Sequence, residues 1–321
     1  MSMDIRGYLL KNGMTTANAG MCQWGFAHKE GHEYFIKEFL SPKYPLDEGK
    51  LGAELTKKMR SSADAFYEKK CVFYNALAKC RSGNNVVVLE FFRHGAKYYA
   101  VTDKVSGSML SVAEVAALSD EKKYILTKAI LYSVASLHTE GIVHSDLRPE
   151  NILIKKTQNG CCTAKIIDFD AGFIETDAPD RIEGSQNYFS PEAVQKTNGD
   201  DVAVTTKADV WALGLLLHQY WCGKMPAFSE KYHYASEAVL NGDSLKMDGT
   251  IPLVMQTLIG EMLCGDYRSR PTAEEAWKFL CKQVPGEAEE ADDGETIVDG
   301  RNRYPDRKPS ADSLWAVPDL D

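Results

Sequence analysis

The residues with the clearest chemical potential lie in two short stretches near the middle of the chain. The first reads His144-Ser-Asp-Leu-Arg-Pro-Glu-Asn151, and the second reads Ile166-Ile-Asp-Phe-Asp170. Phosphoryl transfer needs a carboxylate that orients the attacking hydroxyl, and oxygen ligands for the magnesium ions that neutralise the phosphates. Asp146 can supply the first, and Asn151 and Asp168 can supply the second. The two stretches therefore predict a site for phosphoryl transfer.

These stretches resemble the catalytic loop and the metal motif of the protein-kinase family, which read H-R-D-L-K-P-E-N and D-F-G. Six of the eight loop positions agree. The resemblance implies that Asp146 is the catalytic carboxylate and that Arg148 keeps positive charge near the γ-phosphate. It also implies that Asn151 and Asp168 bind Mg²⁺. The chain is thus identified as a member of the eukaryotic-type (Hanks-type) Ser/Thr protein kinases, and its relaxed motifs favour a bacterial member.

The first third of the chain holds further pieces in the family's order. Lys37, at the end of Tyr34-Phe-Ile-Lys37, resembles the strand lysine that holds the α- and β-phosphates of ATP. Glu68 follows 31 residues later and resembles the carboxylate partner that keeps this lysine extended. If the two do not pair, Glu54 is the next candidate. The resemblance also implies ATP contacts at Thr102, Asp103 and Val105.

The loop expected to cover the phosphates departs from the family pattern. The positions that keep the family's spacing to Lys37 are Thr15, Thr16, Ala17, Asn18, Ala19 and Gly20. Only the last of the family's three glycines remains. Glycine permits a close approach of the backbone to phosphate, whereas any Cβ limits it. This loop is therefore expected to hold ATP less closely than a loop with all three glycines.

Two more departures concern regulation and the metal site. Ser145 replaces the family's arginine, which removes a charge-assisted clamp on a phosphorylated activation segment, so activity should depend less on such phosphorylation. Asp170 replaces the glycine after Asp168-Phe169 and can bring a third carboxylate near the metals. Structural roles are expected for three residues of the family's framework, which are Glu192 in Ser190-Pro-Glu192, Asp209 and Arg270.

The elements that position these residues follow from the pattern of apolar side chains. Tyr34–Leu40, Val86–Phe92 and Tyr98–Val105 have the composition and length of strands. Ser62–Leu77 has the pattern of a helix, with Ala65, Cys71 or Val72, and Leu77 on its apolar face. Ser41–Arg60 contains Pro42, Pro45 and Gly49, which predicts an irregular insertion before that helix.

After residue 108 the pattern becomes helical. Leu126, Ile130, Val134 and Leu137 share one helix face, and Gly141 is expected to end that helix. Three more helices are expected, at Val210–Trp221, Ile251–Cys264 and Thr272–Cys281. The prediction is an α+β, bilobal protein-kinase fold with a β-rich N-lobe at 1–105 and a helical C-lobe at 106–283. Residues 284–321 are expected to be a disordered acidic tail.

Composition and charge narrow the class of protein. The formal net charge is −9, and residues 284–321, with eleven acidic and four basic side chains, contribute −7 of it. A near-neutral body with an acidic tail argues against non-specific nucleic-acid binding. The eight cysteines form no C-x-x-C pair, so a zinc or disulfide framework is not expected. No apolar run reaches membrane-spanning length, and the protein is expected to be cytoplasmic without a membrane partner.

Two alternatives to an active protein kinase stay open. The thin glycine loop and Asp170 also fit a pseudokinase, a binding or scaffold module of the same fold that has lost transfer. Asp168-Phe-Asp170 also fits a small-molecule kinase of related fold, although Glu192, Asp209 and Arg270 favour protein substrates.

One segment of the tail suggests a partner. Glu295-Thr-Ile-Val-Asp299 places an aspartate three residues after Thr296. This resembles the phosphothreonine peptides that forkhead-associated domains read with basic side chains. We hypothesise that the kinase phosphorylates Thr296 and that such a reader binds the product.

Overall fold

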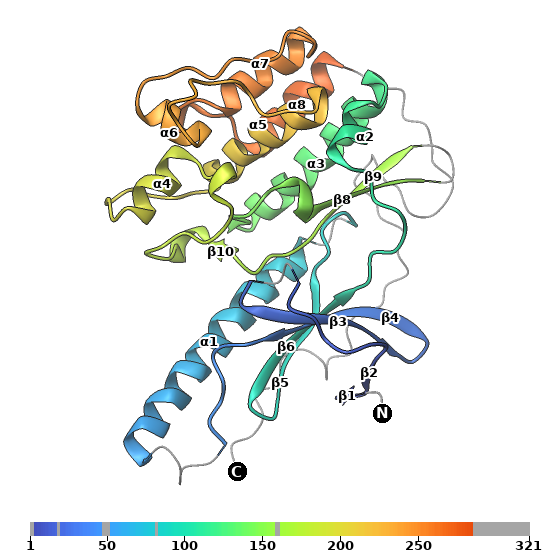
Figure 1. Cartoon of the computed structure of the whole chain (residues 1–321), viewed down its shortest axis with the longest axis vertical. Helices are drawn as coiled ribbons and strands as arrows, with labels where there is room; N and C mark the ends of the chain where they lie inside the picture. Colours follow the sequence, from blue (N-terminus) through green and yellow to red (C-terminus); the bar gives the residue numbers. More distant parts are fainter. Residues whose placement is uncertain (1–2, 18–19, 47–51, 81–82, 158–160, 285–321) are drawn as a thin grey trace. The chain divides into compact units, whose positions relative to one another are not determined.

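The structure is a computed structural model that describes residues 3–17, 20–46, 52–80, 83–157 and 161–284. These residues form two compact units (Figure 1). The smaller unit takes its described residues from Met1–Lys79 and Val86–Ser106. The larger unit takes Cys80–Asn85 and the described residues that follow Gly107.

The smaller unit is built on a six-stranded antiparallel sheet with the order β1-β2-β3-β4-β6-β5. Its strands are β1 Asp4–Ile5, β2 Tyr8–Leu10, β3 Cys22–Lys29, β4 His32–Phe39, β5 Val88–His94 and β6 Lys97–Asp103. β4, β5 and β6 confirm the three strands predicted from the sequence to within two residues at each end. The sequence did not predict β1, β2 or β3.

Side chains alternate between the two faces of this sheet. One face carries a core of Ile5, Tyr8, Leu10, Ala27, Ile36, Phe92, Tyr99 and Val101. The opposite face carries Lys37 and Phe39, because these residues alternate with Ile36 along β4. At the Phe39 end, that second face is covered by the helix α1, whose Phe66 ring lies 5.5 Å from the Phe39 ring.

Helix α1 differs from its prediction in two respects. It spans Ala53–Lys79, so the second part of the expected irregular insertion is helical. The two prolines and Gly49 all precede it, and four of the five residues from Leu55 to Met59 are good helix formers, Thr56 being the exception. The predicted apolar face is confirmed at Leu77, which is buried, and Cys71 is half-buried, but it is wrong at Ala65, which is exposed, as is Val72. The buried residues of the helix are Thr56, Ala63, Phe73, Tyr74 and Leu77.

The larger unit is mostly helical, which confirms the α+β character expected of the chain. Its helices are α2 Val112–Ala116, α3 Asp120–Thr139, α4 Pro191–Thr197, α5 Lys207–Cys222, α6 Ala235–Leu240, α7 Leu253–Met262 and α8 Ala273–Gln283. Two antiparallel strand pairs accompany them, β7 Ile142–Val143 with β10 Phe173–Ile174 and β8 Ile152–Lys156 with β9 Cys162–Ile166.

Helix α5 forms the centre of this unit. It is buried along nearly its whole length, as expected of a helix that is apolar all round. Gly214 lets α7 approach closely, because a Cβ there would lie 2.9 Å from the Leu263 side chain. Two predicted helix ends are confirmed: α3 ends shortly before Gly141, whose φ is +67°, and Thr272 caps α8 in a capping box.

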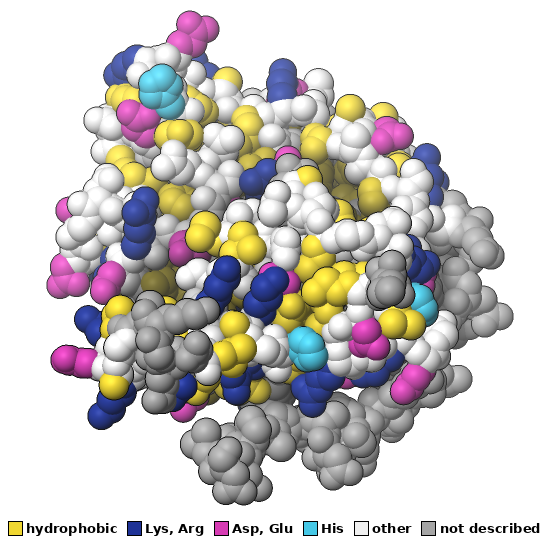
Figure 2. Space-filling model, turned by 60° about the horizontal axis from the view of Figure 1, so that its bottom comes forward, with side chains coloured by type: hydrophobic (Ala, Val, Ile, Leu, Met, Phe, Trp, Pro, Cys, Tyr) yellow, Lys and Arg dark blue, Asp and Glu magenta, His cyan; other side chains and the backbone are white. Residues whose placement is uncertain are grey.

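Within the described ranges, no helix combines the length and the apolar character needed to span a bilayer. On the face drawn in Figure 2, Lys and Arg side chains are scattered among Asp and Glu side chains rather than gathered in one patch. The predicted disordered tail lies outside the described residues, apart from Val284, which follows α8.

Candidate functional site

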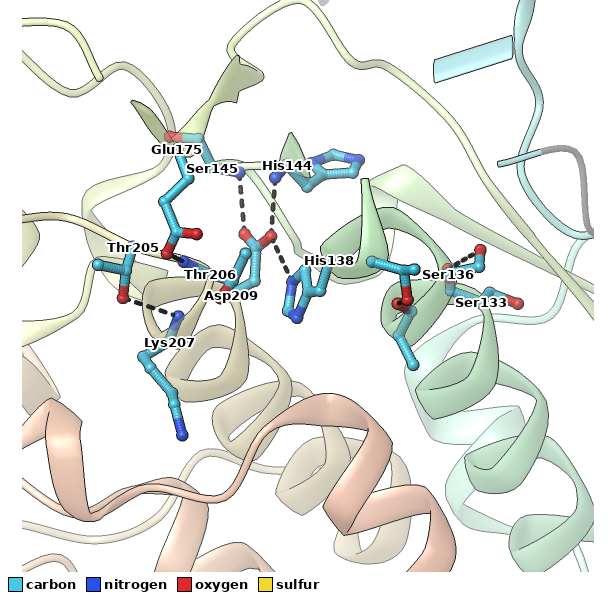
Figure 3. A network of polar contacts seen from close by, with 12 residues as sticks. Ser133, Ser136, His138, His144, Ser145, Glu175, Thr205, Thr206, Lys207 and Asp209 are labelled. Carbon is cyan, nitrogen blue, oxygen red and sulfur yellow. Dashed lines mark hydrogen bonds and ion pairs between the residues drawn. The ribbon is translucent and has the colours of Figure 1, made fainter. Parts of the chain in front are cut away.

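Hydrogen bonds to Asp209, in the first turn of α5, hold the segment after β7 in place (Figure 3). The Asp209 carboxylate accepts hydrogen bonds from the backbone N–H of His144 at 2.7 Å and of Ser145 at 2.9 Å. Its Oδ2 also lies 3.1 Å from Nε2 of His138 on α3. Asp209 is only 1% exposed, so these partners supply what a buried carboxylate requires. The predicted structural role of Asp209 is confirmed.

The same contacts hold an unfavourable backbone conformation. Ser145 has a φ of +69°, which side chains other than glycine rarely adopt. Its N–H is fixed by Asp209, and its hydroxyl donates to the carbonyl of Glu183 at 2.8 Å. The chain thus turns sharply at Ser145, and the next residue, Asp146, is presented from a fixed backbone.

Both oxygens of the Asp146 carboxylate are engaged. The Asn151 side-chain amide donates to Oδ2 at 2.9 Å and to the Asp146 carbonyl at 2.8 Å. The backbone N–H of Ser185 donates to Oδ1 at 2.8 Å. The side chain is half-buried. Its orientation is therefore set before a substrate arrives, which suits a residue that must position a hydroxyl.

Asp168 is brought beside Asn151 by the β8–β9 pair. Ile152 lies opposite Ile166 in that pair, and the N–H of Ile167 donates to the Asn151 carbonyl at 3.0 Å. Asp168 itself has a φ of +62°. The ring of the following Phe169 lies 4.8 Å from the His144 ring, so the turn is packed against the segment that carries Asp146.

The chemistry of these two residues fits a magnesium ion. Mg²⁺ takes oxygen ligands and is usually bound by one or two protein groups together with substrate phosphates. The Asn151 amide nitrogen donates to Asp146, so its side-chain oxygen is the atom that could act as a ligand together with the Asp168 carboxylate. Among the residues that the structure describes, no group of three or more His, Cys, Asp or Glu side chains could hold a metal by itself. Asp170, the possible third carboxylate, is half-buried.

Arg148 forms an ion pair with a close neighbour. Its Nε lies 2.7 Å from Oε2 of Glu150, which is exposed. The hydrogen bond to Glu150 raises the pKa of Arg148, and the same bond lowers the pKa of the Glu150 carboxyl. Arg148 therefore stays charged, but in this structure its charge is partly compensated by Glu150.

The segment that follows β10 packs directly on this site. Gly184 has a φ of +139°, and a Cβ there would lie 2.6 Å from the Ser145 carbonyl oxygen. Glu192, at the start of α4, forms a bidentate ion pair with Arg270, with N–O distances of 2.7 and 2.8 Å. The predicted pairing of Arg270 with Glu192 is confirmed.

In the smaller unit, Lys37 is buried on the β4 face that also carries Phe39. Phe39 contacts Phe66 of α1, and Glu68 lies two residues further, about 200° around the helix. Glu68 is exposed and lines a surface hollow with Lys57, Arg60, Ser61, Asp64 and Ala65. The structure therefore does not turn Glu68 toward the strand that carries Lys37, and their pairing stays a prediction. Glu54, the alternative partner, is also exposed.

The predicted phosphate loop extends from a strand-like pairing. Thr15 and Trp24 exchange two backbone hydrogen bonds of 2.8 and 2.9 Å, and the Trp24 indole N–H donates to the Ala17 carbonyl at 2.9 Å. Thr16, Ala17 and Gly20 are exposed, whereas Asn18 and Ala19 lie outside the described residues. Thr102 and Asp103 end β6, and Val105 follows it half-buried.

The sequence analysis did not identify two residues that contact the candidate site. Ser185 contacts Asp146 through its backbone N–H, which no side-chain pattern announces. Trp24 could have been found, because the alternation Cys22-Gln-Trp-Gly-Phe-Ala27 followed by Glu30-Gly31 is a strand-and-turn signal.

Comparison with known proteins gives one family. Residues 56–279 match the family model described as protein kinase domain. A probable myosin light chain kinase of Dictyostelium discoideum is 28% identical over 167 residues, 49% of this chain and 51% of that protein. Calcium/calmodulin-dependent serine/threonine-protein kinase 1 of Oryza sativa subsp. japonica is 31% identical, over 49% of this chain and 26% of that protein. Myosin light chain kinase A of Dictyostelium discoideum is 26% identical, over 72% of this chain and 75% of that protein. The chain thus spans about half the length of the first of these relatives, and less of the second.

Proposed function

This chain belongs to the protein kinase domain family, and from that premise we propose that it is an enzyme that transfers the γ-phosphate of Mg-ATP to Ser and Thr hydroxyls of proteins. One observation carries the proposal: Asp146 is held at both carboxylate oxygens, by Asn151 and by the backbone of Ser185. The relative from Oryza sativa is named as a serine/threonine-protein kinase, which supports the choice of hydroxyl.

We assign the steps of the reaction to the residues as follows. Asp146 orients the attacking hydroxyl and accepts its proton. Asn151 and Asp168 would hold Mg²⁺, which neutralises charge on the phosphates. Arg148 adds positive charge near the γ-phosphate. In the smaller unit, Lys37 would hold the α- and β-phosphates. Further contacts to the nucleotide are proposed for Thr15, Thr16, Ala17, Asn18, Ala19, Gly20, Thr102, Asp103 and Val105.

A pseudokinase is the second candidate, and a specific observation favours it. Glu68, the carboxylate expected to support Lys37, is exposed in this structure and lines a surface hollow. A binding module would tolerate this, because it needs the fold and not the transfer step. The ordered contacts of Asp146 support the active enzyme instead.

The test is incubation of the purified chain with Mg-ATP and a mixture of Ser- and Thr-containing protein substrates, followed by mass spectrometry of the products. Asp146→Asn should slow transfer with nucleotide binding intact, and Asp168→Asn should abolish it. Loss of an essential acid–base or metal-binding group lowers the rate by on the order of 10²–10⁴. Asp201→Asn, at an exposed aspartate of the same unit, is the control and should be unaffected.

Three outcomes separate the candidates. If the unmodified chain transfers phosphate and both variants lose this activity, the kinase proposal and the two assignments are supported. If neither variant changes the transfer rate, the assignments of Asp146 and Asp168 are wrong. Nucleotide binding without transfer in the unmodified chain identifies a pseudokinase.

The same mass spectra address autophosphorylation and the tail. Thr296 lies outside the described residues, and its proposed modification rests on the sequence Glu295-Thr-Ile-Val-Asp299. A tether to the active site raises the effective concentration of the tail there. An unmodified Thr296 in an active preparation rules out the proposed binding site for a forkhead-associated reader. The cytoplasm as location is likewise a proposal from the sequence.

A further inference from the structure

The side of helix α1 that packs against the sheet carries a basic side chain, Lys70. It lies four residues after Phe66 and four before Tyr74, and residues at this spacing share one face of a helix. The Lys70 ammonium lies 5.7 Å from the centre of the Phe39 ring on β4. On α1, it lies 5.8 Å from the centre of the Phe73 ring and 5.7 Å from that of Tyr74. The ammonium is therefore held between α1 and the sheet.

This side of α1 covers the sheet face that also carries Lys37. Phe39 and Lys37 are two residues apart on β4, so their side chains lie on the same face. The two positions are one row apart, roughly 7 Å along the strand. Lys37 is 9% exposed, and Lys70 is half-buried. Two lysines, one from the strand and one from the helix, therefore lie on the same face of the sheet.

The charged residues of α1 are distributed unevenly between its two sides. All three of its acidic residues are exposed, namely Glu54, Asp64 and Glu68. Two of its charged residues are half-buried, Arg60 and Lys70, and both are basic. The Arg60 Nε donates to the Pro45 carbonyl at 3.3 Å, in the segment before the helix. On the side that faces the sheet, α1 therefore brings positive and not negative charge.

The aromatic surroundings of Lys70 hold its ammonium without neutralising it. The face of a ring attracts an ammonium through its quadrupole, but a ring has no net charge and leaves the charge of the lysine intact. Cations on a face that is partly shielded from water raise the local positive potential and attract anions. A chain of linked phosphates suits two such lysines, because it carries several negative charges and many acceptor oxygens.

The predicted phosphate loop gives a second lysine a purpose. Thr15 and Ala17 stand where the family has two of the glycines that let the backbone approach phosphate closely. A lysine reaches phosphate through a flexible four-carbon stem, so it needs no close approach of the backbone. A lysine on α1 can therefore supply phosphate affinity that this loop is expected to lack.

We propose that Lys70 is a second phosphate-binding lysine, which acts together with Lys37 on the polyphosphate of the nucleotide. This inference rests on the proposed function, because it takes Lys37 as a residue that holds phosphate. It goes further in giving α1 a direct contact with the nucleotide through a cation. In the pattern expected from the sequence, α1 would instead hold Lys37 through the carboxylate of Glu68.

The test measures the binding of three ligands by titration calorimetry in the presence of Mg²⁺: ATP, inorganic triphosphate, and adenosine, which has no phosphate. Lys70→Met keeps an unbranched apolar side chain over the rings and removes the charge. It should weaken the binding of ATP and of triphosphate by about 10-fold or more, the effect of losing one charge-assisted hydrogen bond. Adenosine binding should be unchanged, because adenosine carries no group for Lys70 to bind.

Three further variants guard the interpretation. Lys69→Met removes the charge of the preceding residue, which is exposed, and should leave all three affinities unchanged. Lys70→Arg keeps a positive charge and should retain most of the affinity for triphosphate. Lys70→Glu reverses the charge and should weaken the binding of ATP and triphosphate more than Lys70→Met does.

Each other outcome overturns the inference. Unchanged triphosphate binding in Lys70→Met would show that this lysine only packs on the rings. Tighter ATP binding by Lys70→Glu would show that the face requires a carboxylate beside Lys37. Equal losses for ATP and adenosine would place the defect in the fold of α1. In all three cases, transfer by the unmodified chain would leave the kinase proposal standing, whereas an unmodified chain that binds neither ATP nor triphosphate would reject both proposals.

Discussion

Asp146 has the same partner at two of its atoms, since Asn151 donates both to its carboxylate and to its carbonyl. A residue that must orient a hydroxyl gains from such fixed contacts, because reorientation at the moment of reaction would cost free energy. Under the proposed function Asn151 would have two roles: its side-chain nitrogen orients Asp146, and its side-chain oxygen would bind Mg²⁺. Replacing Asn151 would disturb both at once.

The exposure of Glu68 leads to a prediction at the residue scale. In a double-mutant cycle of Lys37→Met and Glu68→Gln, we expect the effects on the transfer rate to be additive, with Lys37→Met carrying nearly all of the loss. The reason is that Glu68 is exposed and lies about 200° around α1 from Phe66, the residue that packs against Phe39 on the Lys37 face. Sites without contact usually add to within about 0.5 kcal/mol.

Steady-state transfer rates of the four proteins provide the measurement. Strong coupling would show that the two side chains pair in the active enzyme, and hence that α1 turns relative to the sheet when nucleotide binds. Asp64→Asn, one helical turn before Glu68 and also exposed, serves as a control for charge loss on this side of α1.

These residues show what the sequence could and could not predict about the site. The spacing from Asp146 to Asn151 fixes one loop, and the β8–β9 pair that follows brings Asp168 back beside it. The short spacings along the sequence were therefore enough to predict that Asp146, Asn151 and Asp168 lie together. Lys37 and Glu68 are 31 residues apart, and the sequence does not show where between them the helix begins. It cannot give the rotational phase of α1, which is set by the packing of Phe66 against Phe39 and of Tyr67 against Phe91.

At the scale of elements, the segment from β10 to α4 depends on Gly184. A Cβ there would lie 2.6 Å from the Ser145 carbonyl oxygen, 3.0 Å from the Phe189 ring and 3.4 Å from Asp146 Oδ1. We expect Gly184→Ala to push the segment off Asp146 and to lower the transfer rate by on the order of 10²-fold, as known for misplacements of about 1 Å. Initial rates with a protein substrate measure this.

Gly199→Ala is the matched control. Gly199 also has a positive φ, +97°, but its Cβ would meet open space. It shares the backbone strain of about 1–3 kcal/mol without the clash. If both variants lose the same activity, strain alone explains the loss, and close packing on Asp146 does not.

His218 links α5 to the loop before α7 and gives a pH-dependent prediction. Nδ1 lies 2.7 Å from the Lys224 carbonyl, and the Asp248 N–H donates to Nε2 at 3.1 Å. Burial lowers the pKa of His218 from its usual 6.5. The unfolded chain therefore binds a proton more readily than the folded chain does. This contribution to stability is complete above about pH 6.5 and is lost as the pH falls toward the lowered pKa.

Urea unfolding at about pH 8 and about pH 5 checks the sign. The His218→Gln protein should lose less stability between the two than the unmodified protein does. His233→Gln, at an exposed histidine of the same unit, should follow the unmodified protein. An unchanged pH dependence in His218→Gln would show that other groups cause it. The neighbours of His218 with ionisable side chains are Cys222, Lys224 and Asp248, the last two ion-paired at 2.6 Å.

Elements were predictable where the pattern of side chains is strong. Helix α5 and strands β4, β5 and β6 are examples, because a long run of apolar or alternating residues is compatible with few types of secondary structure. β3 could have been found from the alternation in Cys22-Gln-Trp-Gly-Phe-Ala27, although Gly25 weakens that signal. In the structure, eight paired positions along β4 stabilise this strand.

At the scale of the whole molecule, the larger unit is held together by a buried ion pair between distant segments. Arg270 precedes α8, and Glu192 lies in the first turn of α4. Their side chains are 0% and 3% exposed. Arg270 also donates to the carbonyls of Cys264 at 2.8 Å and Lys207 at 2.9 Å, so one guanidinium joins the ends of four helices.

Removing one partner leaves the other charge buried and unpaired, which typically costs about 3–5 kcal/mol. We expect Arg270→Met to lower the free energy of unfolding by this amount in urea titrations. The Arg270→Met, Glu192→Met double variant should recover part of the loss, because it buries no charge. Lys278→Met, which breaks the exposed pair with Glu274, should cost only about 0.5 kcal/mol. A double variant less stable than Arg270→Met would show that the pair stabilises the unit beyond satisfying its own charges.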